Sequence, residues 1–256
     1  MYYNRFIIYV KGESDYEIKR KSCCCNSIHK RNRTCDCKGM RCEGAIVYMG
    51  ARNLERAKEI ADQLNAEGKK VRRVYNDATE DESYAAMIEE VVEKEGRIDV
   101  LVNNFGTSDP KQDLDFAHTD VDVFLNTVNI NLKSVYLASQ AAVKHMEKNG
   151  GGSIINISSI GGQTPDISQV AYGTSKAAIN YLTKLIAVQE ARHNIRCNAV
   201  LPGMTATDAV QNNLSEDFKE FFLRHTPIRR MGQPEEIAAQ SYILQVTSPH
   251  LRPDRY

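Results

Sequence analysis

The feature that most constrains this fold is an alternation of short apolar runs with longer amphipathic segments, from Gly44 to Leu201. The apolar runs are typical of buried strands, and the segments between them space their apolar residues as one face of a helix does. The expected strands are 45–49, 71–75, 98–102, 153–158 and 195–201, and the expected helices are 54–67, 81–95, 124–149 and 170–192. This pattern predicts one α/β domain, a Rossmann-like doubly wound parallel sheet with helices on both faces.

Polar residues follow the expected strands directly. In open parallel sheets, ligands bind at the carboxyl ends of the strands. We therefore expect one edge of the sheet to gather the residues that punctuate these ends, namely Arg52, Asp77, Asn104, Ser159 and Pro202-Gly203.

Tyr172 and Lys176 lie four residues apart in the last expected helix, so their side chains share one face. A phenol is a poor base at neutral pH because its ordinary pKa is about 10, and a neighbouring ammonium lowers that pKa. Such a tyrosine can exchange a proton with an alcohol or a ketone. Ser159, at the end of a strand, can hydrogen-bond the same oxygen. A surface helical pair is the alternative, since this spacing often arises by chance.

The charged residues balance to a net charge of zero, which gives no indication of a nucleic-acid or membrane surface. No apolar run approaches the ~18 residues that cross a bilayer. The run Phe6 to Val10 is too short for a secretory signal and lacks a small-residue cleavage site. We expect a cytoplasmic protein.

Residues 1–43 differ from the rest of the chain. They contain all of the cysteines except Cys197, without helical or strand periodicity. Their spacing does not match paired Cys-x-x-Cys zinc ligands, and disulfides are unusual in the cytoplasm, so no metal site is expected. We divide the chain into this segment, a domain over 44–244 and a foreign tail over 245–256.

Several motifs together resemble the short-chain dehydrogenase/reductase family, in the right order from about residue 44 to 244. They are Asn103-Asn104-Phe105-Gly106, Asn131, Ser159, Tyr172 with Lys176, and Pro202-Gly203-Met204-Thr205-Ala206-Thr207. Within the family, the stretches 102–107, 165–168 and 195–203 are similar to clostridial 7α-hydroxysteroid dehydrogenases, which act on bile acids.

The resemblance implies a role for each matching residue. Tyr172 would be the general acid/base and Lys176 would lower its pKa and hold the nicotinamide ribose, while Ser159 would polarise the substrate carbonyl. Asn131 would anchor a water that links Lys176 to solvent, unless it only bends its helix. Thr164 would touch the substrate, although a plain loop hydroxyl is the simpler interpretation. Contacts to the cofactor would come from Arg52, Asp77, Ala78, Asn104, Phe105, Gly106, Tyr172, Lys176, Pro202, Gly203, Thr205 and Thr207.

The residues after the 45–49 strand bear on the choice of cofactor. An acidic residue there would bind the ribose 2′-hydroxyl of NAD. This chain has Gly50-Ala51-Arg52, and an arginine suits the 2′-phosphate of NADP. We therefore expect NADP rather than NAD. Arg52 as a solvated cation and Asp77 as a helix N-cap are the alternatives.

The family also needs a first strand and a glycine-rich turn before residue 44, where this chain has glycine only at Gly12 and Gly39. Read one base later, codons for residues 22–35 can encode Val-Ala-Val-Val-Thr-Ala-Ser-Thr-Arg-Gly-Ile-Gly-Leu-Ala, a strand followed by that turn. In the other shifted frame, residues 244–256 can encode a sequence that resembles the approach to the last strand. Frameshifts at both ends, real or erroneous, are our hypothesis.

Loss of the first strand would leave two buried sheet edges unpaired and remove the cradle for the cofactor's pyrophosphate. We therefore expect the chain as written to fold poorly and turn over little. The resemblance implies a homotetramer formed through the two longest helices and the last strand, but the altered tail argues against it here. Two alternative functions stay open, a reductase of 3-oxoacyl groups or other small carbonyls, and a non-catalytic product of a decayed gene.

Overall fold

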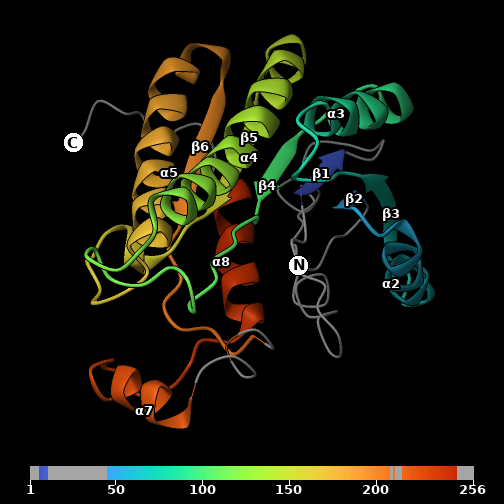
Figure 1. Ribbon diagram of the computed structural model, residues 1–256. Coiled ribbons are helices and arrows are strands. Elements are labelled where there is room, and N and C mark those ends of the chain that lie inside the picture. Colours follow the sequence, from blue (N-terminus) through green and yellow to red (C-terminus); the bar gives the residue numbers. More distant parts are fainter. Residues whose placement is uncertain (1–5, 11–44, 208–209, 211–214, 247–256) are drawn as a thin grey trace.

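The computed structural model describes residues 6–10, 45–207, 210 and 215–246 (Figure 1). Their strands form one sheet in the order β3-β2-β1-β4-β5-β6. This is the strand order of a doubly wound Rossmann fold, and the predicted fold class is confirmed. The strands are β1 (Phe6–Val10), β2 (Ile46–Ala51), β3 (Lys70–Tyr75), β4 (Val100–Asn103), β5 (Gly152–Ile157) and β6 (Ile195–Val200).

The four predicted helices, α2 to α5, begin and end within a few residues of the predicted bounds, whereas α7, α8 and the short helices η2 and η3 were not predicted. α4 begins at Val121 rather than residue 124, because the Asp120 side chain accepts a hydrogen bond from the backbone N–H of Asp122 and caps the helix. The helical elements are α2 (Leu54–Ala66), α3 (Glu82–Glu95), α4 (Val121–Lys148), η2 (Ile160–Gly162), α5 (Val170–Gln189), η3 (Ala191–His193), α7 (Glu216–Arg224) and α8 (Pro234–Val246).

The core has two parts, one on each face of the sheet. On one face, Met87 and Ile88 of α3 pack with Ala138 and Ala142 of α4 against the strands. On the other face, Leu64 of α2 and Ala238 of α8 belong to a second cluster. Helices on both faces bury the strands between them, which explains why the strand sequences are continuous apolar runs.

The central strand corrects two of our expectations. Residues 6–10, which we did not predict to be a strand, form β1 between β2 and β4. β1 runs antiparallel to both neighbours, so the sheet is mixed, whereas the pairs β2-β3, β4-β5 and β5-β6 are parallel as predicted. The prediction of two unpaired sheet edges is therefore wrong, because β1 hydrogen-bonds to both strands.

The direction of β1 matters for the site. Phe6 pairs with Asn103 at the carboxyl end of β4, and Val10 pairs with Ile46 at the amino end of β2. β1 therefore ends at the edge of the sheet opposite to the one where ligands bind in such folds. A parallel strand in this position would deliver the following turn to the ligand edge instead.

The cysteines before residue 44, the shifted-frame stretch 22–35 and the tail over 247–256 lie outside the described residues. Among the helices that the structure does describe, none combines the length and apolar character needed to cross a membrane.

Candidate active site

Lys176 lies at the centre of the site, with its side chain buried in α5 and its ammonium group at the carboxyl ends of β4 and β5. Its Nζ donates hydrogen bonds to the carbonyl oxygens of Ile157 at 3.0 Å and Phe105 at 3.4 Å. A Cβ added to Gly106 would lie 2.8 Å from Nζ, so a residue with a side chain would crowd the ammonium. The strand ends therefore hold Lys176 in a defined position.

Burial lowers the pKa of Lys176 from 10.5 to about 8. An ammonium in a low-dielectric site loses hydration, which disfavours its charged form. The shift means that the folded protein bears a free-energy cost for keeping this lysine charged near neutral pH.

We expect Lys176→Met to raise the free energy of unfolding near neutral pH by about 1–3 kcal/mol, because methionine removes the buried charge but leaves two carbonyls without their donor. Below the folded pKa of about 8 the cost is fully present. Above this pH the unfolded chain binds more protons than the folded protein, so the wild type gains stability as pH rises. The difference in free energy of unfolding between Lys176→Met and the wild type therefore decreases as the pH approaches 10.5.

Urea denaturation at several pH values between about 6 and 10 checks this prediction. Lys184→Met, at an exposed lysine of the same helix, is the control and should change stability by less than about 0.5 kcal/mol. Equal destabilisation of both variants at every pH would contradict the proposed cost.

Tyr172 lies one turn before Lys176, and Lys176 Nζ is 5.5 Å from the centroid of its ring. Burial raises the pKa of Tyr172, and a hydrogen bond with Ser159 lowers it by less. The sequence led us to expect a lowered pKa, and the structure differs because desolvation of the phenol dominates. Ser159 also accepts the backbone N–H of Gly161 at 3.2 Å, which fixes its hydroxyl at the start of η2.

η2 packs directly on the helix that carries Tyr172. A Cβ on Gly162 would lie 2.6 Å from the backbone carbon of Lys176. Only glycine permits this approach, and it is what brings Ser159 next to the phenol.

Asn131 is fully buried in the middle of α4, and its side chain binds the segment after β4. Its Oδ1 accepts the Thr107 N–H at 2.8 Å, and its Nδ2 donates to the Thr107 carbonyl at 2.9 Å and to Ser175 Oγ at 3.0 Å. Asn131 thus ties the 104–107 segment to α5. The predicted water stays a prediction. We did not predict Thr107 or Ser175, because nothing in the sequence shows that they meet Asn131.

Arg52 and Asp77, predicted to contact the adenosine end of the cofactor, lie together after β2 and β3. Arg52 Nε is 3.6 Å from Asp77 Oδ2. Asp77 also accepts the N–H and hydroxyl of Thr79 at 2.9 and 2.8 Å. Asp77 does not cap α3, whose N-cap is Asp81, so the alternative role that we considered for it is not the one observed.

Two other predicted cofactor residues face the core. The side chains of Ala78 and Phe105 are 4 % and 2 % exposed and belong to the cluster under α3 and α4. Any contact of theirs with a cofactor must therefore use the main chain. Asn104 and Gly106, next to Phe105, lie at the carboxyl end of β4.

The segment after β6 crosses the same edge of the sheet. The carbonyl of Pro202 accepts the N–H of Ile160 at 3.0 Å, which joins this segment to η2. The Thr205 hydroxyl donates to the Gly203 carbonyl at 3.1 Å, and the Val210 N–H donates to the Thr207 hydroxyl at 3.3 Å. The contacts of Thr205 and Thr207 with a cofactor stay predictions.

A cavity of about 740 Å³ opens in front of Tyr172 and Ser159. Its lining includes Thr164, whose contact with a substrate stays a prediction, together with the apolar side chains of Phe116, Met204 and Phe222. Ligand cavities of roughly 300–1,000 Å³ with apolar walls and a few polar groups take small organic molecules. The hydroxyls of Tyr172 and Ser159 therefore face a space that suits a bulky apolar molecule.

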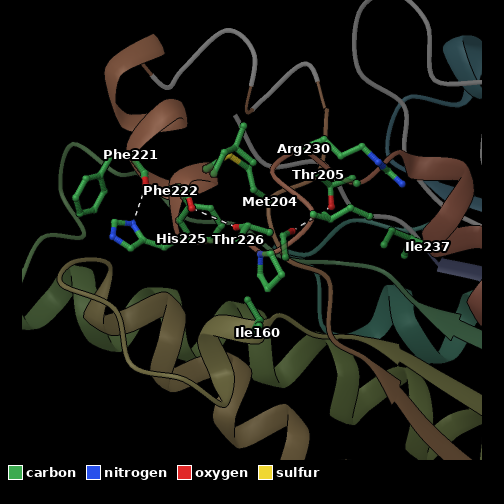
Figure 2. A pocket seen from close by; sticks show the side chains of 14 residues that line it. Ile160, Met204, Thr205, Phe221, Phe222, His225, Thr226, Arg230 and Ile237 are labelled. Carbon is green, nitrogen blue, oxygen red and sulfur yellow. Dashed lines mark hydrogen bonds between the residues drawn. The ribbon is translucent and has the colours of Figure 1, made fainter.

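A second hollow of about 580 Å³ lies between α7 and α8 (Figure 2). It shares Ile160, Met204 and Phe222 with the first cavity. Arg230 at its rim is paired with Glu236, with hydrogen bonds of 2.7 and 2.8 Å. The segment from Gly203 to Thr226 thus contributes residues to both spaces.

The described residues fit two parts of a nicotinamide dinucleotide. Arg52 and Asp77 lie where the adenosine end would sit, and the space beside Gly106 that a Cβ would close lies next to the buried ammonium of Lys176. The described segments contain no glycine-rich turn for the pyrophosphate, and β1 leads away from that edge.

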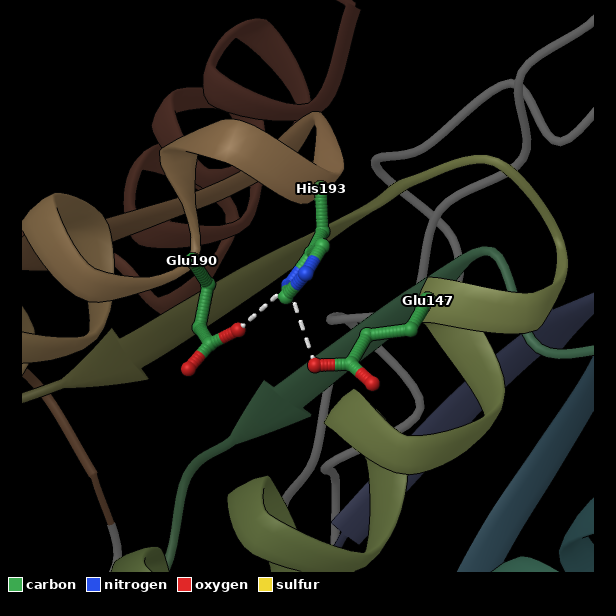
Figure 3. Close-up of side chains that lie close together, drawn as sticks. All are labelled: Glu147, Glu190 and His193. Atoms are coloured by element: carbon green, nitrogen blue, oxygen red, sulfur yellow. Dashed lines mark hydrogen bonds and ion pairs between the residues drawn. The ribbon is translucent and has the colours of Figure 1, made fainter.

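A polar cluster also lies at the opposite edge of the sheet, where β5 and β6 begin (Figure 3). His193 Nδ1 is 2.9 Å from a carboxylate oxygen of Glu190 and 3.0 Å from one of Glu147. These contacts join the ends of α4 and α5. The hydrogen bonds to His193 explain why the two carboxylates lie close together.

Comparison with known proteins agrees with this geometry. A family profile described as enoyl-(acyl carrier protein) reductase matches residues 36–248. The 7α-hydroxysteroid dehydrogenase of Clostridium sardiniense is 50% identical over 196 residues, which are 77% of this chain and 75% of that protein. The chain belongs to the short-chain dehydrogenase/reductase family. It is thus related to oxidoreductases that act on hydroxyl groups.

Other members of this family show its range. The 7α-hydroxysteroid dehydrogenase of Paraclostridium sordellii is 50% identical over 195 residues, which are 76% of this chain and 73% of that protein. The 3-oxoacyl-[acyl-carrier-protein] reductase of Thermotoga maritima is 36% identical over 196 residues, covering 77% of this chain and 78% of that one.

Solved structures of the family have the same fold. A 7α-hydroxysteroid dehydrogenase in complex with NADH and 7-oxo glycochenodeoxycholic acid is 31% identical, with a TM-score of 0.72 over 78% of this chain and 77% of that one. A gluconate 5-dehydrogenase from Burkholderia cenocepacia, in complex with NADP and tartrate, is 28% identical, with a TM-score of 0.74 over 80% of both chains. Both complexes contain a nicotinamide cofactor, one of each kind.

Proposed function

We propose that this short-chain dehydrogenase/reductase interconverts the 7α-hydroxyl and the 7-ketone of a bile acid with NADP(H). The observation that carries the proposal is the cavity of about 740 Å³, whose apolar walls surround the hydroxyls of Tyr172 and Ser159. A steroid is a rigid apolar body with a few polar groups, which is what these walls suit. The identity of 50% to two 7α-hydroxysteroid dehydrogenases supports the same substrate.

In the reducing direction, Ser159 donates a hydrogen bond to the substrate carbonyl oxygen and Tyr172 gives that oxygen a proton. A nicotinamide cofactor held at this edge would supply the hydride to the carbonyl carbon, which would gain two electrons and become an alcohol carbon. The ammonium of Lys176 stabilises the phenolate that remains on Tyr172. In the oxidising direction the phenolate takes the proton back.

NADP is the cofactor that the residues after β2 favour. Arg52 follows the strand directly, where an acidic residue would select NAD, and its side chain is 40% exposed. Its ion pair with Asp77, at 3.6 Å, is long enough that the guanidinium retains hydrogen-bond donors for a phosphate.

We expect Arg52→Gln to weaken NADPH binding roughly 10-fold or more, because a hydrogen bond between charged groups contributes about 1.5–3 kcal/mol. NADH, which has no 2′-phosphate, should bind within about twofold of wild type. Titration of nicotinamide fluorescence measures both. Arg56→Gln is the control, since Arg56 lies one turn into α2 and pairs with Glu59. An equal loss for NADPH and NADH would contradict the assignment.

An absorbance assay at the nicotinamide band tests the substrate. We expect oxidation of chenodeoxycholate with NADP⁺ and little oxidation of its 7β epimer. The main alternative substrate is an acetoacetyl thioester, because a 3-oxoacyl reductase is among the relatives. Its reduction should have a kcat/KM at least tenfold lower than that for oxidation of chenodeoxycholate. Preference for the thioester would replace the steroid proposal, and binding of neither cofactor would favour a non-catalytic product.

A further inference from the structure

We propose that Asp113 is a positioning residue that holds the catalytic helix α5 in register from a separate loop. The expected effect on turnover rests on the proposed function, whereas the contacts of Asp113 lie within the protein and do not depend on which substrate binds. Asp113 is fully buried, although its neighbours in the loop between β4 and α4 are exposed. A buried carboxylate needs hydrogen-bond partners, and two of those of Asp113 are backbone N–H groups of α5.

The first turn of α5 has no cap of its own. Its N-cap, Gln169, has φ of 60° and its side chain makes no capping hydrogen bond. The first N–H groups of a helix lack partners within the helix and must find them elsewhere. Asp113 supplies them: Oδ1 accepts the N–H of Ala171 and Oδ2 that of Tyr172, both at 2.9 Å.

The next residue in the loop completes the cap. The carbonyl of Leu114 accepts the N–H of Val170 at 3.2 Å. Three consecutive N–H groups at the start of α5 are thus satisfied by two adjacent residues that lie 56 to 59 positions earlier in the chain. The carboxylate also lies at the positive end of the helix dipole, where its oxygens meet the unpaired N–H groups of the first turn.

One of these N–H groups belongs to Tyr172 itself. The carboxylate therefore fixes the main chain of the residue whose side chain transfers the proton, rather than a distant part of the helix. Ser108 Oγ lies 3.3 Å from Asp113 Oδ2 and 3.2 Å from Gln169 Oε1, which links the start of the loop to the same cap.

The same loop forms a wall of the substrate cavity. Asp115 and Phe116, just after Asp113, line it. Phe105, before the loop, accepts a hydrogen bond from Lys176. The loop is thus attached to α5 at Lys176 and at Tyr172, and Asp113 sets the distance between the proton donor and the wall that places the substrate. A misplacement of about 1 Å in such an arrangement can cost roughly 100-fold in rate.

Hydrogen exchange measured by mass spectrometry tests the position without any substrate. In Asp113→Asn, one oxygen becomes an N–H donor that faces another donor, so we expect peptides that cover 169–176 to exchange about tenfold faster or more. Peptides from α3 should be unchanged. Asp109→Asn is the matched control, because Asp109 lies in the same loop, is exposed and bonds only within its turn.

Steady-state kinetics tests the consequence. Asp113→Asn should lower kcat about 10- to 100-fold and leave the Kd of NADPH within about twofold, because no cofactor contact is touched. A general loss of stability would instead lower both kcat and the affinity for NADPH. Asp109→Asn should match the wild type in all three measurements.

The proposal is overturned if Asp113→Asn exchanges and turns over like Asp109→Asn, or if kcat and cofactor affinity fall together. If Asp113→Asn does not fold, Ser108→Ala replaces it, with an expected decrease in kcat of about threefold and faster exchange in the same peptides. If the wild type does not oxidise a bile acid but exchange responds as expected, the proposed function fails and the positioning role stands.

Discussion

Replacement of Tyr172 by phenylalanine is expected to lower the rate of hydride transfer roughly 1,000-fold, because general acid/base catalysis contributes about 10²–10⁴-fold. The phenol faces the cavity of about 740 Å³ next to Ser159, one helical turn from Lys176, so it is placed to give a proton to a carbonyl oxygen there. The ring remains, so the cavity keeps its shape. Binding of NADPH should stay within about threefold.

Single-turnover measurements with enzyme in excess give this rate directly, even if the cofactor binds weakly. Tyr181→Phe removes the same hydroxyl from an exposed tyrosine of the same helix, 63% exposed, and should leave the rate unchanged. A Tyr172→Phe protein with more than about a tenth of wild-type activity would contradict the role assigned to the phenol.

Restoration of a parallel first strand is expected to have a second large effect, on cofactor affinity. In the variant, residues 22–35 are replaced by Val-Ala-Val-Val-Thr-Ala-Ser-Thr-Arg-Gly-Ile-Gly-Leu-Ala, the sequence that the shifted reading frame can encode. We propose that this strand displaces β1, which runs antiparallel to its neighbours and ends at the edge of the sheet opposite to the ligand edge. The glycine turn after it would then reach the edge where Asn104 and Lys176 lie.

Backbone N–H groups at such a turn bind the pyrophosphate, and each hydrogen bond to a charged oxygen contributes about 1.5–3 kcal/mol. Two of them would tighten NADPH binding roughly 100-fold or more. Calorimetric titration of the chain as written and of the restored chain measures the difference. The control is the restored chain with both glycines of its turn changed to valine, which should lose the gain.

Equal affinity of the chain as written and the restored chain would contradict this prediction. It would mean that the antiparallel β1 permits normal binding. Sequencing of the coding DNA across residues 22–35 then separates an error in the sequence from a decayed gene.

The periodicity of the sequence was sufficient to predict β2 to β6 and α2 to α5 within a few residues, because buried strands are continuous apolar runs and the helices carry an apolar stripe. β1 was missed because Phe6–Val10 lies in a segment without other structural signals, although it is as long as strands that we did predict. The composition of a strand also does not determine its direction, since an apolar run can pair with its neighbours in a parallel or an antiparallel arrangement.

For the site, the sequence by itself determined which residues we propose to react. Tyr172 and Lys176 share a helix face at any tertiary arrangement, because they are four residues apart, and Ser159 ends a strand whose carboxyl end faces the ligand edge. Their side-chain chemistry then fixes what they can do.

Only the tertiary structure decided how those residues are held and charged. The caps on α5 come from Asp113 and Leu114, and the partners of Asn131 are Thr107 and Ser175, contacts that join distant segments. The lowered pKa of Lys176 and the raised pKa of Tyr172 arise from burial between strand ends. Local sequence spacing encodes geometry within one element, whereas desolvation and long-range hydrogen bonds exist only once the elements have packed.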